Sequence, residues 1–284
     1  MYTRREFLMQ SGGGVLLSGL PKKELTIQDV INLIMDETTH IQMESTVDTI
    51  KSGDPTQPVR AIFTTFMATQ SIIDYAVRQG VNLIITHEPT FYNHLDETQW
   101  LENNQVYQKK RKTLEENGIV VWRFHDSWHG HQPDGILTGA LKMLGWEAYS
   151  ESMQPHVCQI PSISLAELSQ FLKVRFSAQR IRVIGDSGML CSRVGLLVGA
   201  ASGQRQIDML SEVDVLVVGE VREWETTEFV RDANWQGDQP KGLIVLGHAL
   251  SEEPGMKWLA EWLTPRLPSV IVAHQPSGDP FYFV

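Results

Sequence analysis

The stretch LIITHEP, residues 83–89, decides how the rest of this 284-residue chain is interpreted. Its short apolar run predicts a buried strand, and that strand ends on an imidazole beside a carboxylate, His87 and Glu88. A second strand, RAIFTTF at 60–66, and a helix, QSIIDYAVRQG at 70–80, come before it. Strands joined through a helix in this way pair in parallel, with a right-handed crossover. The stretch therefore predicts an α/β fold with a largely parallel sheet.

The sequence on either side of this unit predicts two domains. A third buried strand, IVVWRFH, follows at 119–125, and from about residue 149 short strands alternate with short helices in a smaller α+β pattern. The buried strand KGLIVLGH and an amphipathic helix then lead to the end of the chain. We expect an α/β domain at 25–148 plus 241–284, and a second, α+β domain at 149–240.

The first 22 residues are a separate segment. TRREFL at 3–8 resembles the twin-arginine export motif, in which a hydroxyl residue precedes the pair Arg4 and Arg5, and a mild apolar run, GGGVLLSGL, follows it. We exclude residues 1–22 from the fold and expect an exported, periplasmic protein. The alternative is a frayed N-terminus on a cytoplasmic protein.

Replacing both Arg4 and Arg5 by lysine tests this export signal. The variant is expected to stay in the cytoplasm while the wild-type protein is exported, because the export receptor reads the arginine pair. Cell fractionation followed by immunoblotting gives the measurement. Wild type and variant in the same compartment would remove the twin-arginine interpretation.

Composition and charge exclude several classes of protein. The chain is 42% hydrophobic and 20% charged, as in an ordinary globular protein, and no stretch approaches the roughly 20 apolar residues of a membrane span. The net charge of −10 argues against a phosphate-binding surface for nucleic acid. Cys158 and Cys191 are the only cysteines, too few for a disulfide framework or a thiolate cage. A metal in this protein would therefore be held by nitrogen and oxygen.

Histidines follow the ends of three predicted strands. His87 ends the first, His125 and His129 follow the next, and His248 ends the third, with Glu252 four residues later. The carboxyl ends of parallel strands meet along one sheet edge, where ligands bind, and residues four apart share a helical face. A single histidine of this kind is more often a surface or capping residue than a ligand. The histidines without this placement are interpreted as surface or core residues: His40, His94, His131, His156 and His274.

The residue types of this cluster select the chemistry. Imidazole and carboxylate ligands without thiolates suit zinc, iron, manganese or nickel. Glu88, Glu252 and three or four histidines are more ligands than one tetrahedral ion needs. Two divalent ions about 3.5–4 Å apart would use them all. The pattern therefore indicates a dinuclear metal centre.

These segments, in this order, resemble the Nif-three-like dinuclear metal-centre family, whose members are also labelled GTP cyclohydrolase I type 2 homologues. The likeness covers nearly everything from Leu25 to Val284. Its specific anchors are LIITHEPTFY and GHALSE, and its weaker ones are LTIQDV, HDSWH, DVLVVGEVRE and the terminal GDPFYFV. The resemblance implies two α/β domains with the metals in a cleft between them, and a homo-hexameric ring whose sites face an inner cavity.

The resemblance also assigns the metal ligands, and this chain departs from the family pattern at two of them. His87, His248 and Glu252 match the family's ligand positions. Glu88 stands where the family has a second histidine, and His129 stands where it has an aspartate. Together the two exchanges keep three imidazoles and two carboxylates, so that the formal ligand charge is unchanged. We expect all five residues to bind metal; the alternative is a decayed site that has lost it.

Three further residues lie beside the predicted ligands. We expect His125 to be an extra ligand, or a residue behind the ligands that orients one of them or transfers a proton. Glu220 and Arg222 follow a predicted strand and either line the pocket or form a solvated salt bridge.

The resemblance implies a hydrolase that uses two divalent ions, zinc, iron or manganese, on a small-molecule substrate that the sequence does not name. The alternative is a non-enzymatic, ring-shaped metal-binding scaffold or metal store. Metal analysis of the native protein, followed by a substrate screen, discriminates between the two.

Overall fold

The computed structural model of the chain describes residues 24–38, 45–282 and 284. The expected export signal at 1–22 lies outside these residues. None of the helices in the described part of the chain combines the length and the apolar character that a membrane crossing needs.

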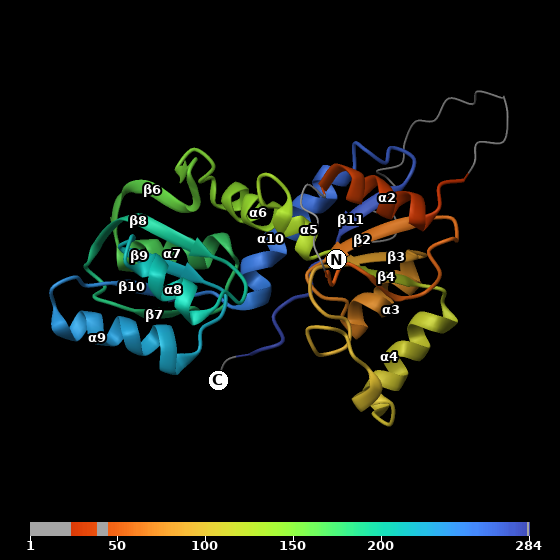
Figure 1. Cartoon of the computed structure of the whole chain (residues 1–284), viewed down its shortest axis with the longest axis horizontal. Coiled ribbons are helices and arrows are strands. Elements are labelled where there is room, and N and C mark those ends of the chain that lie inside the picture. The colour runs from red at the N-terminus through yellow and green to blue at the C-terminus, as the bar shows by residue number, and fades with distance from the viewer. Residues whose placement is uncertain (1–23, 39–44, 283) are drawn as a thin grey trace. The chain divides into compact units, whose positions relative to one another are not determined.

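The chain divides into two compact units, whose elements are labelled in Figure 1. The first unit contains the described residues up to Gly135 and the segment Met256–Ser277. The second unit contains Ile136–Gly255 and the C-terminal segment Gly278–Val284.

The first unit is built on a five-stranded sheet in the order β1-β4-β3-β2-β11. Strands β2, β3, β4 and β11 pair in parallel, and β1 runs antiparallel to β4 at one edge. The strand bounds are Ile50–Ser52 for β1, Ala61–Thr65 for β2, Leu83–Thr86 for β3, Val120–Arg123 for β4 and Ile271–His274 for β11. All residues of β2, β3 and β4 are buried, which explains why each strand begins with an apolar run, although threonine or arginine follows at its carboxyl end.

The helices of the first unit begin at capping residues that the sequence shows locally. Helix α2 (Ile27–Thr38) starts after Thr26, whose hydroxyl accepts the Asp29 N–H at 3.1 Å while the Asp29 carboxylate accepts the Thr26 N–H at 3.0 Å. The other elements are α3 (Gln70–Gln79), the 3₁₀ turn η1 (Gln99–Leu101), α4 (Gln105–Glu116) and the short α5 (Asp126–Gly130). Apolar residues of α3 and α4 pack with those of β2, β3 and β4 into one core.

The second unit is built on a six-stranded mixed sheet in the order β5-β6-β8-β9-β10-β7. The pairs β8–β9 and β9–β10 are parallel and the remaining pairs are antiparallel. The strand bounds are Ser150–Glu151 for β5, Gln154–Ser164 for β6, Arg182–Ile184 for β7, Leu190–Leu197 for β8, Val215–Val218 for β9 and Gly242–Val245 for β10. The helical elements are α6 (Gly135–Leu144), α7 (Leu165–Arg175), α8 (Gly203–Leu210), the π-helical turn η2 (Glu223–Thr227), α9 (Glu228–Gln236) and the start of α10 (His248–Leu263).

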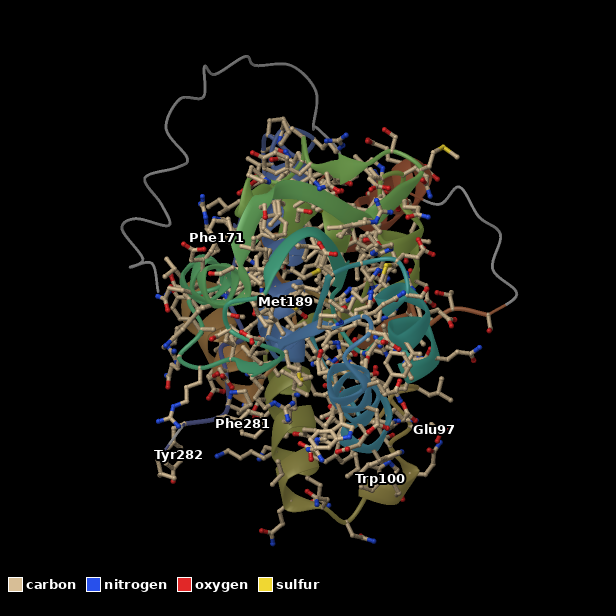
Figure 2. The ribbon with its side chains drawn as sticks, turned by 90° about the vertical axis from the view of Figure 1, so that its left-hand side faces the viewer. Glu97, Trp100, Phe171, Met189, Phe281 and Tyr282 are labelled. Atoms are coloured by element: carbon tan, nitrogen blue, oxygen red, sulfur yellow. The ribbon has the colours of Figure 1, made fainter. Side chains whose placement is uncertain are left out.

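The main core of the second unit lies between the sheet and helix α7. A capping box between Ser164 and Glu167 starts this helix. Leu165, Leu168 and Leu172 are fully buried on one helical face. Phe171 and Met189, both labelled in Figure 2, pack against the edge of the same core.

Strand β10 belongs to the second unit, which corrects the predicted domain boundary. The sequence predicts that 241–284 belongs to the first domain, but β10 pairs with β9 and β7 in the six-stranded sheet. The boundary between the units falls later, between Gly255 and Met256. The hydrophobic pattern of a four-residue strand that is buried on both faces does not indicate which sheet the strand joins. Its pairing partners therefore cannot be predicted from the local sequence.

Close glycine contacts hold the first turns of α10 against α6. A Cβ atom added at Gly139 would lie 2.5 Å from the Cα atom of Gly255, and one added at Gly255 would lie 2.5 Å from the Cα atom of Ile136. The two backbones approach this closely because neither glycine has a side chain. This contact fixes the part of α10 that carries His248 and Glu252 within the second unit.

Candidate metal centre

His87 is the first residue after β3 and is fully buried. Its backbone N–H donates to the carbonyls of Thr65 and Phe66 at 3.2 and 3.1 Å. The end of the neighbouring strand β2 therefore holds the backbone at the end of β3. Its ring Nδ1 lies 3.2 Å from the carbonyl oxygen of Phe124. A carbonyl only accepts hydrogen bonds, so Nδ1 carries the proton and the lone pair is on Nε2.

His125 immediately precedes the short helix α5 and His129 lies on it, four residues later; Asp48 fixes the first turn of this helix. The Asp48 carboxylate accepts the backbone N–H groups of His125, Asp126 and Ser127 at 2.7, 2.9 and 2.8 Å. A carboxylate at this position satisfies amide groups that have no partner within the helix and interacts favourably with the helix dipole. The backbone carbonyl of His125 then accepts the N–H of His129 at 3.0 Å.

The rings of His87, His125 and His129 converge. The ring centroid of His87 lies 4.5 Å from that of His125 and 5.0 Å from that of His129, and the last two are 4.9 Å apart. One ring nitrogen from each residue lies within 4.8 Å of the other two. Three nitrogens this close can bind the same ion.

Carboxylates hold the Nδ1 atoms of His125 and His129. Nδ1 of His125 lies 2.9 Å from Oδ1 of Asp126, and Nδ1 of His129 lies 3.0 Å from Oδ2 of Asp134. Burial opposes ionisation of Asp126, but hydrogen bonds from the Val47 N–H and the His125 ring outweigh it and hold the pKa of Asp126 below its usual value. An ionised carboxylate accepts a hydrogen bond from Nδ1–H, so that Nε2, with its lone pair, is the metal-binding atom, the usual arrangement of metal-binding histidines.

Histidines elsewhere show which part of this pattern is specific. His131 and His156 also direct Nδ1 at a backbone carbonyl, at 2.7 Å from Pro133 and 3.0 Å from Leu196. Neither belongs to a group of converging ligand atoms among the described residues. The Nδ1 contact is therefore common, and the convergence of three rings is the feature that indicates a metal site.

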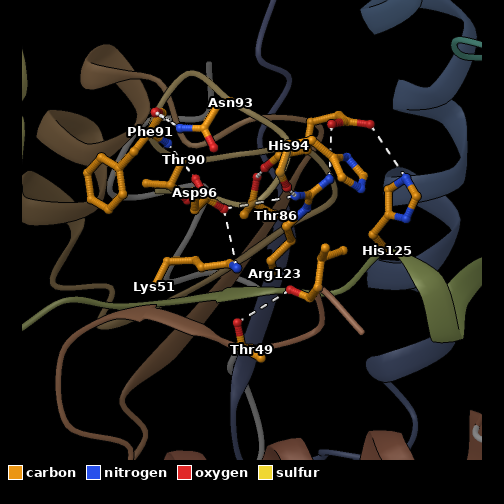
Figure 3. Close-up of polar contacts among 12 residues, drawn as sticks. Thr49, Lys51, Thr86, Thr90, Phe91, Asn93, His94, Asp96, Arg123 and His125 are labelled. Atoms are coloured by element: carbon orange, nitrogen blue, oxygen red, sulfur yellow. Dashed lines mark hydrogen bonds and ion pairs between the residues drawn. The ribbon is translucent and has the colours of Figure 1, made fainter. Parts of the chain in front are cut away.

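The Glu88 carboxylate is held by the buried guanidinium of Arg123 (Figure 3). Nη2 of Arg123 donates to Oε2 of Glu88 at 3.3 Å, Nε donates to the His87 carbonyl at 3.0 Å, and Nη1 donates to the His94 carbonyl. The other oxygen of Glu88, Oε1, lies 3.6 Å from Nε2 of His125. One buried cation thus fixes the backbone on both sides of Glu88 and leaves one carboxylate oxygen beside the histidine cluster.

Further charges lie under the same loop. The side chain of Asp96 is 3% exposed and lies 3.4 Å from Nζ of Lys51 and 4.0 Å from Nη1 of Arg123. Lys110 donates to the Thr90 carbonyl at 2.6 Å. Burial lowers the pKa of Lys110 to about 8, although the nearby charge of Asp96 opposes the shift. Figure 3 shows Lys51, Asp96 and Arg123 joined in one chain of polar contacts.

A second cluster lies within the second unit. His248 is the first residue of α10 and Glu252 lies one turn later, with their Nε2 and Oε2 atoms 3.0 Å apart. Nδ1 of His248 lies 3.0 Å from Oε1 of Glu220, which follows β9. The Glu252 side chain is 3% exposed, whereas that of Glu220 is 57% exposed. His248 is thus held between a buried carboxylate and an exposed one.

Within each unit the structure brings predicted ligands together. His87, Glu88, His125 and His129 gather in the first unit, and His248 and Glu252 pair in the second, where Glu220 joins them. The exposed side chain of Arg222 pairs with Glu225 at 3.2 Å and not with Glu220, so the salt bridge between Glu220 and Arg222 that the sequence offered as an alternative is not formed.

Sequence reasoning missed the residues that hold the ligands in place. Arg123 carries a signal, because an arginine inside the apolar strand IVVWRFH requires a buried partner. Asp126 and Asp134 also carry one, because each is an acid within five residues of a candidate ligand. Asp48 carries no local signal, since the residues it contacts are 77 to 79 positions later in the chain.

The donor set of the first unit fits a divalent metal ion. Three imidazoles with Nδ1–H engaged by oxygen present neutral nitrogen ligands, and imidazole suits zinc, copper, iron and nickel. The described residues thus contain a group that could hold a metal, as the sequence analysis expected.

Known proteins match nearly the whole chain. The family model described as Duf34/NIF3 (NGG1p interacting factor 3) matches residues 25–277. A protein of Clostridium acetobutylicum named GTP cyclohydrolase 1 type 2 homolog is 24% identical over 277 residues, covering 91% of this chain and 99% of its own length. An Escherichia coli K12 protein of the same name is 27% identical over 219 residues, covering 73% of this chain and 80% of its own length.

Two solved structures share the fold at low sequence identity. The Staphylococcus aureus hypothetical protein SA1388 aligns with a TM-score of 0.73 at 18% identity, covering 92% of this chain and 100% of its own. A Bacillus cereus protein related to NIF3 aligns with a TM-score of 0.70 at 17% identity, covering 93% and 100%. At these identities the likeness shows the fold alone, and the family match shows membership. The chain belongs to the Duf34/NIF3 family.

Proposed function

We propose that this protein is a hydrolase that depends on a dinuclear divalent-metal centre. The proposed ligands are His87, Glu88, His129, His248 and Glu252, and His125 is an additional ligand. The observation that carries the proposal is the convergence of three imidazoles, from the end of β3 and from α5, with each Nδ1 engaged by an oxygen. The name that these relatives share, GTP cyclohydrolase 1 type 2 homolog, supports the hydrolase class and leaves the substrate of this chain open.

Some residues of the chain would bind the ions, and others would orient the ligands. When bound, divalent ions would polarise the scissile group of the substrate and lower the pKa of water. Glu220 and Asp134 would fix the rings of His248 and His129 through Nδ1. Arg123 would hold one oxygen of Glu88 and keep the other beside His125.

Glu252→Gln tests the proposal. The amide keeps the shape of the side chain and removes its charge, so we expect at least one of two ions per chain to be lost. Far-ultraviolet circular dichroism should stay near that of the wild type, because Glu252 contributes no apolar packing to the sheet. Native mass spectrometry counts the ions, and a panel of phosphoesters, amides and nucleotides measures hydrolysis before and after the change.

His94→Ala is the control, because its ring lies outside the converging group. It should keep both the metal count and any turnover of the wild type. Full metal occupancy of the wild type without turnover on any substrate class would overturn the hydrolase proposal in favour of a metal-binding scaffold. An unaltered metal affinity in Glu252→Gln would remove Glu252 from the ligand set.

A further inference from the structure

We infer that the first unit carries a complete metal site of its own, made of His87, His125 and His129, which binds one divalent ion without a ligand from the second unit. The inference rests on the metal-binding part of the proposed function and goes beyond it. It makes His125 an obligatory ligand, it separates one ion from the other, and it specifies which kind of metal the first site takes.

Each of the three rings is held by its own partners within the first unit. His87 is fixed by backbone contacts at the end of β3, and its Nδ1 by the Phe124 carbonyl. His125 and His129 are fixed by the Asp48 cap of α5 and by a separate carboxylate for each ring. A site arranged in this way loses little conformational freedom when an ion binds, and this favours affinity.

Burial increases in one direction across the site. His87 is fully buried, and the side chains of His125 and His129 are 20% and 33% exposed. An ion can therefore reach the rings from the side of α5 and be bound against the buried ring of His87. Three imidazoles and one open position are the ligand set of a known class of catalytic zinc site.

His129 gives the three-ring site an imidazole at the position where the family resemblance implies an aspartate. The carboxylate near this ring is that of Asp134, whose Oδ2 lies 3.0 Å from Nδ1 of His129. Glu88 is not one of these three ligands: Arg123 holds its Oε2 at 3.3 Å, and its Oε1 lies beside the site, 3.6 Å from Nε2 of His125. Three neutral nitrogens favour zinc, cobalt, nickel or copper over manganese or magnesium, which prefer oxygen ligands.

Metal titrations of the full-length protein test the inference. Zn²⁺, Co²⁺ and Mn²⁺ would be titrated separately into the wild type and into the double variant His248→Ala/Glu252→Gln, with bound ions counted by mass spectrometry and Co²⁺ followed by its visible absorption. We expect the double variant to keep one Zn²⁺ or Co²⁺ per chain, with an unchanged Co²⁺ spectrum for that ion. We expect Mn²⁺ to bind this site at least about tenfold more weakly, following the ligand preference.

Changes in the first unit identify the ligands. His125→Ala, added to the double variant, should weaken this ion by more than about a hundredfold, because losing a ligand exceeds the 10–100-fold effect of losing an outer hydrogen-bond partner. Asp134→Asn keeps α5 intact. It should lower the affinity for this ion by about 10–100-fold, because Asp134 orients the ring of His129. His94→Ala is the matched control, since its ring centroid lies 6.2 Å from that of His125 and outside the group, and it should change nothing.

Each outcome decides a different claim. If the wild type binds ions and the double variant binds none, the first unit is not a site by itself and the inference is wrong. The inference would also be wrong if adding His125→Ala to the double variant left the affinity for this ion unchanged. A wild type that binds no ion at all would overturn the proposed metal dependence, whatever the variants do.

Discussion

Arg123→Met should lower the free energy of unfolding by about 3–5 kcal/mol, the cost of removing one partner from a buried ion pair. The Arg123 side chain is fully buried and donates to the carbonyls of His87 and His94 and to the carboxylate of Glu88. Methionine fills a similar volume and donates nothing, so that two carbonyls and a largely buried carboxylate lose their hydrogen-bond partner. Urea unfolding followed by circular dichroism measures the difference.

Arg111→Met is the matched control for this loss of charge. Arg111 pairs with Glu115 at 2.8 Å on the surface of α4, where both side chains are more than half exposed. Surface pairs of this kind contribute little, so that the urea midpoint should hardly move. Equal midpoints for the two variants would show that the guanidinium of Arg123 does not hold the loop after β3. Arg123→Met, unlike this control, should also weaken metal binding, because the backbone on both sides of Glu88 would be released.

Features that depend on residues close together in the chain could be predicted from the sequence. The helix starts at Thr26 and Ser164 were predictable, because each capping residue and its partner lie within three positions of one another. The strand ends at His87 and His125 were predictable from the apolar runs before them. These are local patterns, and they identified the three residues that the structure brings together.

What depends on contacts far apart in the chain could not be read in this way. The sequence contains the arginine in IVVWRFH, but its partner at Glu88 lies 35 positions earlier. The sheet that strand β10 joins is set by its pairing with β9 and β7, and the short apolar run of β10 fits either sheet. The assumption that three strand ends share one sheet edge was wrong for His248, because this histidine follows a strand of the six-stranded sheet.

Gly199→Ala should remove metal from the Glu252 position with only a small loss of stability. Gly199 has a φ of +72°, and a Cβ added to it would lie 1.9 Å from Oε1 of Glu252 and 2.7 Å from its Cδ. The clash is with the end of a flexible side chain, so that Glu252 can rotate away and the backbone can stay in place. The carboxylate would then leave its position 3.0 Å from Nε2 of His248. We expect the affinity for the ion at Glu252 to fall by about a hundredfold or more, since this exceeds the effect of disturbing an outer partner.

Gly145→Ala separates the backbone effect from the effect on Glu252. Gly145 has nearly the same φ, +71°, and a Cβ added there meets nothing within 4 Å. Both variants should lose about 1–2 kcal/mol, because an alanine in the left-handed region is strained wherever it lies. Only Gly199→Ala should lose metal, and Gly145→Ala should bind as the wild type does. Metal counts by mass spectrometry and urea unfolding curves for both variants give the two readouts. If the two variants bind metal equally well, the position of the Glu252 carboxylate beside Gly199 is not what metal binding requires, and Glu252 is not a ligand.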